Sequence, residues 1–256
     1  MENEDGTFVN QESNISSRIH KIQEPPGKDE DWLQRYLDAH PELLPMRDLE
    51  GIESNLKLIG RELNGIDLLF VDEKGLLTVV ETKLDDNPEV RRKVVAQLFD
   101  YAAMLSKWDV DDLCLSIAML SGSKFIEELS GLQKLSEALH RHVHNGKFTE
   151  ESAKSAKTIF SNYVMEGEAK ETTRPSRKGE LFLKNLDMML AEGGFRLVIA
   201  TYEVSSQLLD LLNYVNSTTQ RGHQVVAVEL SRENLRDGSY FIPHLVGAPQ
   251  VLSAVY

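Results

Sequence analysis

Two short apolar runs, residues 66–71 and 76–80, stand out in the first half of the chain, and a polar turn separates them. Runs of Val, Ile, Leu and Phe of this length, bounded by turn-forming residues, predict two β-strands joined as a hairpin. Three charged residues interrupt the apolar pattern: Asp67, Glu81 and Lys83. An ionised side chain in a buried strand is costly unless it pairs or binds a metal ion. The three residues therefore need a shared explanation.

The length of the turn decides whether Asp67 and Glu81 share a face, because side chains alternate along a strand. A two-residue loop at residues 73–74 would place Asp67 beside Val80. A three-residue loop ending at Gly75 is a common hairpin geometry when the glycine is left-handed, and it places Asp67 opposite Glu81. The second geometry brings the two carboxylates together.

Opposed carboxylates repel each other unless a cation lies between them. A divalent ion held by two carboxylates and waters is a typical magnesium arrangement, so Asp67 and Glu81 predict a site for Mg²⁺ or Mn²⁺. Lys83 shares a strand face with Glu81 and could orient a water or stabilise phosphate charge. The structural alternative is an ordinary ion pair between Asp67 and Lys83, with Glu81 solvated at a sheet edge. The surrounding apolar residues favour a buried hairpin and hence the metal site.

Further elements are predicted on both sides of the hairpin. Residues 29–39 have the pattern of an amphipathic helix, and residues 56–61 predict a first strand. After the hairpin, valines and leucines recur at helical spacing along residues 88–105. Gln97 and Tyr101 are four residues apart and therefore share a face of that helix.

One ordered set combines these features: Asp67, then Glu81-Thr82-Lys83 after a hairpin, then Gln97 and Tyr101 on the next helix. This combination resembles the PD-(D/E)XK nucleases, which have the restriction-endonuclease-like fold. The resemblance extends over residues 29–105 and implies an α/β core with a central mixed β-sheet flanked by helices. The chain departs from the family pattern at Ile66, where a proline often precedes the aspartate.

The resemblance also implies roles in phosphodiester hydrolysis by in-line attack of water. Asp67 and Glu81 would hold the metal ion, with the main-chain carbonyl of Thr82 as a further ligand. Lys83 would polarise the water or stabilise the pentavalent phosphorus, and Gln97 would steady Lys83 or a phosphate.

Accessory residues follow from the same resemblance. An acidic residue on the first helix often points into the family's site, and Glu30 is the candidate, although Asp31 is as eligible. Favourable interaction with the helix dipole is the simpler explanation for both acids. Glu62 flanks the first strand and could lend a carboxylate or be a solvated turn residue, while Tyr101 would brace its helix against the sheet.

The second half of the chain alternates helices and strands. Residues 110–120 fit a buried strand or a helix, and residues 124–144 predict a helix. A β-α-β unit with parallel strands and a right-handed crossover is predicted near the end, followed by a proline-containing edge strand. The segments are helix 181–191 with a Gly193-Gly194 stop, strand 195–202, helix 205–216, strand 224–230 and edge strand 240–246.

We therefore expect four regions. These are an N-terminal arm at residues 1–27, a nuclease-like core at 28–145, a polar linker or loop at 146–178 and a smaller C-terminal α/β region at 179–256. The arm could add a strand near residues 15–22 or contact a second subunit.

Composition and charge limit the functional classes. The chain has 256 residues, of which 41% are hydrophobic, and no apolar run approaches a membrane span. The start of the chain lacks a signal-peptide pattern and the single cysteine, Cys114, excludes an internal disulfide, so we expect a cytoplasmic protein. The net charge of −13 opposes non-specific nucleic-acid binding, which depends on Lys and Arg.

Other chemistries are excluded or less favoured. The chain has no phosphate-binding Gly-Lys-Ser/Thr loop and no Gly-x-Ser-x-Gly motif, which excludes P-loop nucleotidases and serine hydrolases of that type. His140, His142 and His144 raise a zinc site, but no carboxylate or thiolate lies nearby in sequence. Their place at a helix C-terminus explains them more simply.

The expected function is a metal-dependent DNA endonuclease. Arg91, Arg92 and Lys93 lie in the first turns of a helix, where the dipole does not favour cations, so they could meet DNA phosphates or form a solvated face. A homodimer would supply one site for each DNA strand. The acidic charge points to a protein partner, or to a catalytically silent nuclease-fold module that binds nucleic acid or protein. RNA or a small phosphoester is a third substrate class.

Overall fold

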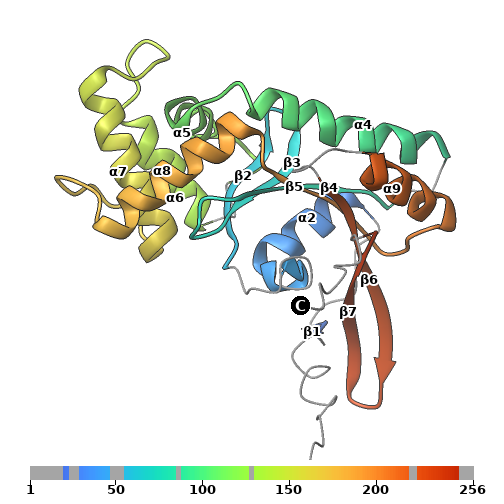
Figure 1. The fold of residues 1–256 in the computed structure, drawn as a ribbon. Helices are drawn as coiled ribbons and strands as arrows, with labels where there is room; N and C mark the ends of the chain where they lie inside the picture. The colour runs from blue at the N-terminus through green and yellow to red at the C-terminus, as the bar shows by residue number, and fades with distance from the viewer. Residues whose placement is uncertain are drawn as a thin grey trace, which may run out of the picture.

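The computed structural model describes residues 20–22, 29–46, 55–84, 88–126, 130–218 and 224–247, and side chains 88–91 and 130 are outside the description. Within these residues, seven strands form one sheet in the order β1-β7-β6-β5-β4-β3-β2 (Figure 1). The sheet is mixed, because β4 and β6 each pair in parallel with β5 and all other neighbours are antiparallel. The strands are β1 His20–Lys21, β2 Lys57–Leu63, β3 Ile66–Val71, β4 Leu77–Thr82, β5 Arg196–Thr201, β6 Gln224–Leu235 and β7 Gly238–Val246.

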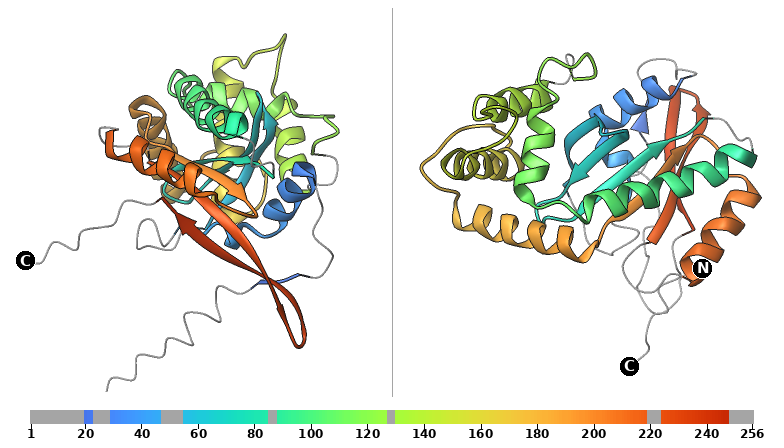
Figure 2. Two further views of the ribbon diagram at one scale, coloured as in Figure 1. Left: turned by 90° about the vertical axis from the view of Figure 1, so that its right-hand side faces the viewer. Right: turned by 90° about the horizontal axis from the view of Figure 1, so that it is seen from above.

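Helices cover both faces of this sheet, so the fold is α/β. Helix α2 lies on one face, and helices α4 and α9 lie on the other (Figures 1 and 2). Helices α5 to α8 gather beyond the β2 edge, where α5 and α6 contact β2. The helices are α2 Glu30–Ala39, the 3₁₀ turn η1 Pro41–Leu43, α4 Pro88–Leu105, α5 Val110–Ala118, α6 Ser130–His140, α7 Glu150–Glu166, α8 Arg177–Glu192 and α9 Ser206–Thr218.

The β3–β4 hairpin has the three-residue loop expected from the sequence. Gly75 has a φ of 85°, in the left-handed region, and the Asp72 amide donates to the carbonyl of Leu76 at 3.2 Å. Leu68 pairs with Val80 in the ladder. The next positions outward are Asp67 and Glu81, which therefore lie opposite each other as predicted.

A buried ion pair connects the turn of this hairpin to β5. Arg196 Nη2 lies 2.9 Å from Asp72 Oδ2, and Arg196 Nη1 donates to Thr78 Oγ1 at 3.3 Å. Asp72 and Arg196 have 0% and 3% exposed side chains, so this is an ion pair that is almost fully removed from water. The pair holds the hairpin against the strand that follows it in the sheet.

The C-terminal part of the chain completes the same sheet. Strands β5 and β6 are parallel and joined by α9, which confirms the predicted β-α-β unit. Because β5 also pairs with β4, this unit extends the hairpin's sheet and does not form a second one. The expectation that this proline-containing strand is the sheet edge was wrong, because the described residues of β1 pair with β7 at Tyr240 and Phe241. Pro243 pairs with Leu230 of β6 and lies beyond this short stretch.

The prediction of a polar linker or loop at residues 146–178 was wrong. Helix α7 lies within it, between a capping box at Thr149 and Ser152 and a left-handed Gly167. Polar residues in this helix suggested a solvated loop, but Ser161 and Asn162 are buried. They donate hydrogen bonds to the main-chain carbonyls of Thr158 and Lys170, which satisfies their polar groups inside the protein.

The described residues also bear on three further predictions, which concern residues 110–120, the N-terminal arm and membrane spans. Residues 110–120, which fitted a strand or a helix, form α5 over Val110–Ala118. Of the predicted N-terminal arm only residues 20–22 are described, and they include β1. No helix in the described ranges combines the length and the apolar character needed to cross a membrane.

Candidate metal and phosphate site at the end of the hairpin

The carboxylate of Asp67 is held by the opposite strand. Its Oδ2 accepts from the main-chain N–H of Thr82 at 2.7 Å and from the Thr82 hydroxyl at 2.6 Å. The residue is 8% exposed, so the charge is largely removed from water. These two hydrogen bonds fix where Asp67 Oδ2 points.

Glu81 and Lys83 form the second part of the site. Lys83 Nζ lies 3.2 Å from Glu81 Oε1 and 3.1 Å from Glu30 Oε2 on α2. Glu81 is 1% exposed, and its Oε2 is buried with no hydrogen-bond partner among the described residues. An unsatisfied carboxylate oxygen at this depth is a costly feature that a bound cation would relieve.

The charges of the site shift the pKa values of its groups. Burial, and then the charge of Asp67, raise the pKa of Glu81 to about 7, against the opposing effect of Lys83. Burial on its own would lower the pKa of Lys83, but the negative charges of Glu81, Glu30 and Asp67 outweigh it and raise this pKa overall. Lys83 is therefore cationic at neutral pH, while Glu81 is close to its midpoint.

Glu30 rather than Asp31 enters the cluster. Besides contacting Lys83, Glu30 accepts from the main-chain N–H of Leu84 at 3.4 Å. Asp31 pairs instead with Arg61 and Arg35. Asp29 caps the helix by accepting from the N–H of Trp32, so Glu30 in the first turn is available to the hairpin.

Gln34 is a site residue that the sequence interpretation missed. Its Nε2 donates to Glu62 Oε1 at 3.2 Å and contacts Thr82 Oγ1 at 3.5 Å, while its Oε1 accepts from Arg61 Nε at 3.1 Å. Gln34 thus orients the threonine that contacts Asp67. The sequence did contain a signal for Gln34: it lies four positions after Glu30, so the two residues share a face of the helix.

Glu62 lies beside the same network in an unusual backbone conformation. Its φ of 52° is in the left-handed region, which few residues other than glycine adopt. Burial raises the pKa of Glu62, with the charge of Asp67 adding to the effect and the hydrogen bond from Gln34 opposing it. The structure thus brings this accessory candidate close to Asp67.

Gln97 and Tyr101 of α4 contact each other, and Tyr101 also contacts the β2–β3 turn. The Tyr101 hydroxyl donates to the main-chain carbonyl of Gly65, which is the bracing contact expected of this residue. Burial, and then the charges of Glu81 and Asp67, raise the pKa of Tyr101 to about 12, although a hydrogen bond from Gln97 opposes this. Gln97 Oε1 is buried and unpartnered in the described part of the chain. The one hydrogen bond described for Gln97 thus joins it to Tyr101, whereas the expected partner was Lys83 or a phosphate.

The basic residues at the start of α4 are not joined to this network by any described contact. Arg92 and Lys93 have exposed side chains, and the side chain of Arg91 is outside the described residues. The exposed side chains of Arg92 and Lys93 are compatible with both earlier interpretations, a solvated helix face and a surface that contacts DNA phosphates. Neither residue forms an ion pair within the described ranges.

The fit of a divalent ion can be judged from the donors present. Mg²⁺ usually binds one or two carboxylates and keeps several waters, so Asp67 and Glu81 offer a suitable set without a third protein carboxylate. The unpartnered Glu81 Oε2 is the atom that such an ion would satisfy. The residues present therefore fit a magnesium or manganese ion.

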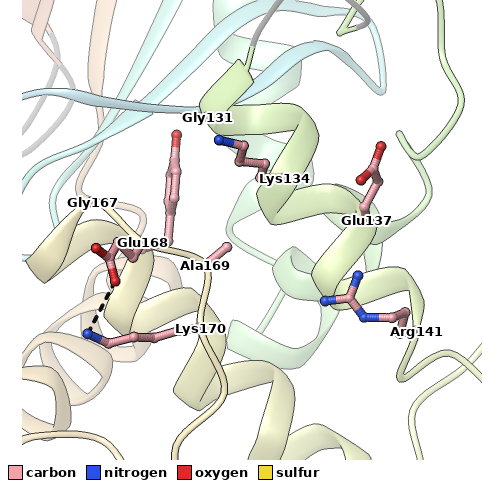
Figure 3. A pocket seen from close by; sticks show the side chains of 9 residues that line it. Gly131, Lys134, Glu137, Arg141, Gly167, Glu168, Ala169 and Lys170 are labelled. Atoms are coloured by element: carbon pink, nitrogen blue, oxygen red, sulfur yellow. Dashed lines mark ion pairs between the residues drawn. The ribbon is translucent and has the colours of Figure 1, made fainter.

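A separate pocket of about 310 Å³ lies between α6 and the segment after α7 (Figure 3). Its lining carries charges of both signs, including the ion pair between Lys170 and Glu168. None of the hairpin residues lines it. The histidines at which a zinc site was considered and disfavoured have other contacts, since His140 contacts the carbonyl of Ala118 and His142 lies 3.6 Å from Glu171.

Comparisons of this chain with models of protein families, with curated proteins and with solved structures gave no match.

Proposed function

We propose that this protein is a metal-dependent endonuclease that hydrolyses phosphodiester bonds in DNA, built on a restriction-endonuclease-like core. The observation that carries the proposal is Glu81, a buried carboxylate opposite Asp67 and in contact with Lys83, with one oxygen that has no partner among the residues the structure describes. A structural ion pair would satisfy both oxygens. The order of elements, a three-stranded antiparallel unit between α2 and α4, supports the same core.

Each residue has a role that follows from its contacts. Asp67 and Glu81 would hold Mg²⁺ or Mn²⁺, with the Thr82 carbonyl as a further ligand, and the bound ion supplies Lewis-acid activation of water and phosphate. Lys83 is cationic and stabilises the negative charge that develops on the phosphate. Glu30 and Glu81 hold Lys83 in place from two sides.

The surrounding residues preserve this arrangement. Gln34 and Thr82 fix the direction of the Asp67 carboxylate, so that its other oxygen faces away from them. Tyr101 attaches α4 to the β2–β3 turn by a hydrogen bond. Gln97 supports Tyr101, and the side-chain carbonyl oxygen of Gln97 is buried without a partner among the described residues. Pre-positioned groups of this kind contribute to catalysis because little reorganisation remains.

Partners and compartment are part of the same proposal. A homodimer would present one site to each DNA strand, and Arg92 and Lys93 would contact the backbone phosphates. The net charge of −13 weakens long-range attraction to DNA, so a protein partner that delivers the substrate fits the proposal. We assign the protein to the cytoplasm.

A specific observation favours a second candidate, a catalytically silent module that binds nucleic acid or protein. Lys83 is already paired on both sides, and Thr82 donates two hydrogen bonds to the same oxygen of Asp67. Such a network resembles a closed structural cluster. The unpartnered oxygen of Glu81 is what argues for the active site instead.

Cleavage assays separate the two candidates. Supercoiled plasmid, single-stranded DNA and RNA are incubated with the full chain in Mg²⁺ or Mn²⁺, together with Lys83→Ala and the matched control Lys74→Ala in the exposed turn. We expect cleavage of DNA that falls at least about 100-fold in Lys83→Ala, since loss of one charge-stabilising donor has that size of effect. Lys74→Ala should retain the wild-type rate.

Two results would contradict the endonuclease. One is equal cleavage by Lys83→Ala and the wild type, which would indicate a contaminating nuclease. The other is saturable DNA binding in a mobility-shift assay without cleavage of any substrate in either metal, which is the result expected of the silent module.

A further inference from the structure

A second group of ligand-type side chains lies at the other end of α2. His20 of β1, His40 at the C-terminal cap of α2 and Glu42 of η1 come from three separate segments. Among the described residues, they are the one group of three or more His, Cys, Asp or Glu whose ligand atoms all lie within 4.8 Å of one another. The group shares no residue with the hairpin site.

The spacing of the donor atoms matches a tetrahedral ion. Glu42 Oε1 lies 3.3 Å from Nδ1 of His20 and 3.3 Å from Nδ1 of His40. Ligands bound to one tetrahedral zinc ion at about 2.0–2.1 Å are separated from each other by about 3.3–3.4 Å. Two of the three donor separations thus already have the value that a shared ion requires.

Packing holds the two imidazole rings in place. Their centroids are 4.0 Å apart, and the ring of Tyr36 lies 5.8 Å from that of His20 and 4.7 Å from that of His40. His20 Nε2 is buried without a partner in the described structure, so the ring's polar contact is made through Nδ1. Glu42 is 59% exposed, which leaves the group open to solvent on one side.

We propose that His20, His40 and Glu42 form a binding site for Zn²⁺, with a water in the fourth position, that fastens β1 to the C-terminal end of α2. Two histidines and one glutamate are an established zinc ligand set, and imidazole ligands favour Zn²⁺ over Mg²⁺. The competing explanation is that Glu42 only bridges the two rings by hydrogen bonds. This site is independent of the hairpin and of the proposed endonuclease.

The direct test is calorimetric titration of the full-length, chelator-treated protein with ZnCl₂ in excess Mg²⁺. We expect one zinc ion per chain. His40→Ala and Glu42→Gln should each weaken binding at least about 100-fold, more than loss of an outer partner of a metal ligand. His244→Ala, which removes an exposed histidine on β7, is the matched control and should bind as the wild type does. Glu81→Gln should also leave zinc binding unchanged, which separates this site from the hairpin.

Thermal unfolding gives a second readout. Zinc should raise the Tm of the wild type and of His244→Ala but not that of Glu42→Gln, because a ligand stabilises only the state that binds it. Glu42→Gln keeps the size of the side chain and a hydrogen-bonding oxygen, so it decides the matter if His40→Ala does not fold. Absence of saturable zinc binding by the wild type, or unchanged affinity in Glu42→Gln and His40→Ala, would overturn the proposal in favour of the hydrogen-bonded cluster.

Discussion

Two buried carboxylates lie at opposite ends of the same hairpin, and only one of them is fully satisfied. Asp72, at the turn, accepts from two turn amides at 2.9 and 3.0 Å through Oδ1 and contacts Arg196 at 2.9 Å through Oδ2. Glu81, at the open end, contacts Lys83 through one oxygen, while the other is unpartnered in the described chain. The two residues have nearly the same burial.

The difference separates a structural role from a chemical one. Because every oxygen of Asp72 has a partner, its charge stabilises the turn and attaches it to β5. Glu81 is held in a setting that penalises its charge, and this cost is expected where a site is built for a ligand rather than for stability. The predictions below test the contrast, beginning with the largest effect.

Removal of the Asp72 carboxylate should destabilise the protein most. Asp72→Ala removes one partner of the buried ion pair with Arg196, which costs about 3–5 kcal/mol of unfolding free energy. The measurement is urea unfolding followed by circular dichroism. Glu73→Ala, one residue along the same turn, is the matched control and should lose much less. Equal losses in the two variants would show that the Asp72–Arg196 pair has no special structural role.

Replacement of Glu81 should increase the stability of the folded protein at high pH, whereas replacement of Asp72 lowers it. The pKa of Glu81 is raised from 4.5 to about 7 in the folded protein, so the wild type loses stability as the pH rises through this window. A shift of that size corresponds to a loss on the order of 3 kcal/mol. Glu81→Gln cannot ionise, and Lys83 keeps its contact with Glu30, so the variant should be the more stable protein at pH 8.

Urea unfolding of both proteins at pH 4.5 and pH 8, without divalent metal, measures this difference. The stability of Glu81→Gln relative to the wild type should increase between the two pH values. A constant difference would mean that Glu81 titrates normally and that its surroundings are not under electrostatic strain.

The contact between Tyr101 and the β2–β3 turn should have the smallest effect. Tyr101→Phe removes the hydroxyl's hydrogen bonds with the carbonyl of Gly65 and with Gln97, each worth about 0.5–1.5 kcal/mol. Urea unfolding checks the stability, and the cleavage assay shows whether the bracing of α4 matters to the site. A loss as large as that of Asp72→Ala would mean that Tyr101 is a main support of the fold.

Much of the hairpin could be predicted from local sequence. Gly75 allows the left-handed turn residue that sets the register, and strand alternation then places Glu81 and Lys83 on one face. Both inferences use neighbouring residues only. The structure agrees with them because the covalent geometry of a strand and a short turn leaves few alternatives.

The rest of the site depends on contacts that local patterns do not encode. Gln34 meets Thr82 across 48 positions, and the choice of Glu30 over Asp31 depends on how α2 packs on the sheet. The pairing of β5 with β4 likewise joins segments that are separated by five helices. In α7, buried Ser161 and Asn162 reverse the usual meaning of polar residues because main-chain carbonyls satisfy them.

Binding of Mn²⁺, followed by electron paramagnetic resonance of the free ion, tests the central claim most directly. The wild type should bind Mn²⁺ saturably at the hairpin, and Glu81→Gln should bind it at least about 10-fold more weakly, while Glu73→Gln, which changes a carboxylate of the turn, should match the wild type. Equal Mn²⁺ affinity in Glu81→Gln and the wild type would show that the unpartnered oxygen of Glu81 is not a metal ligand, and would contradict the account.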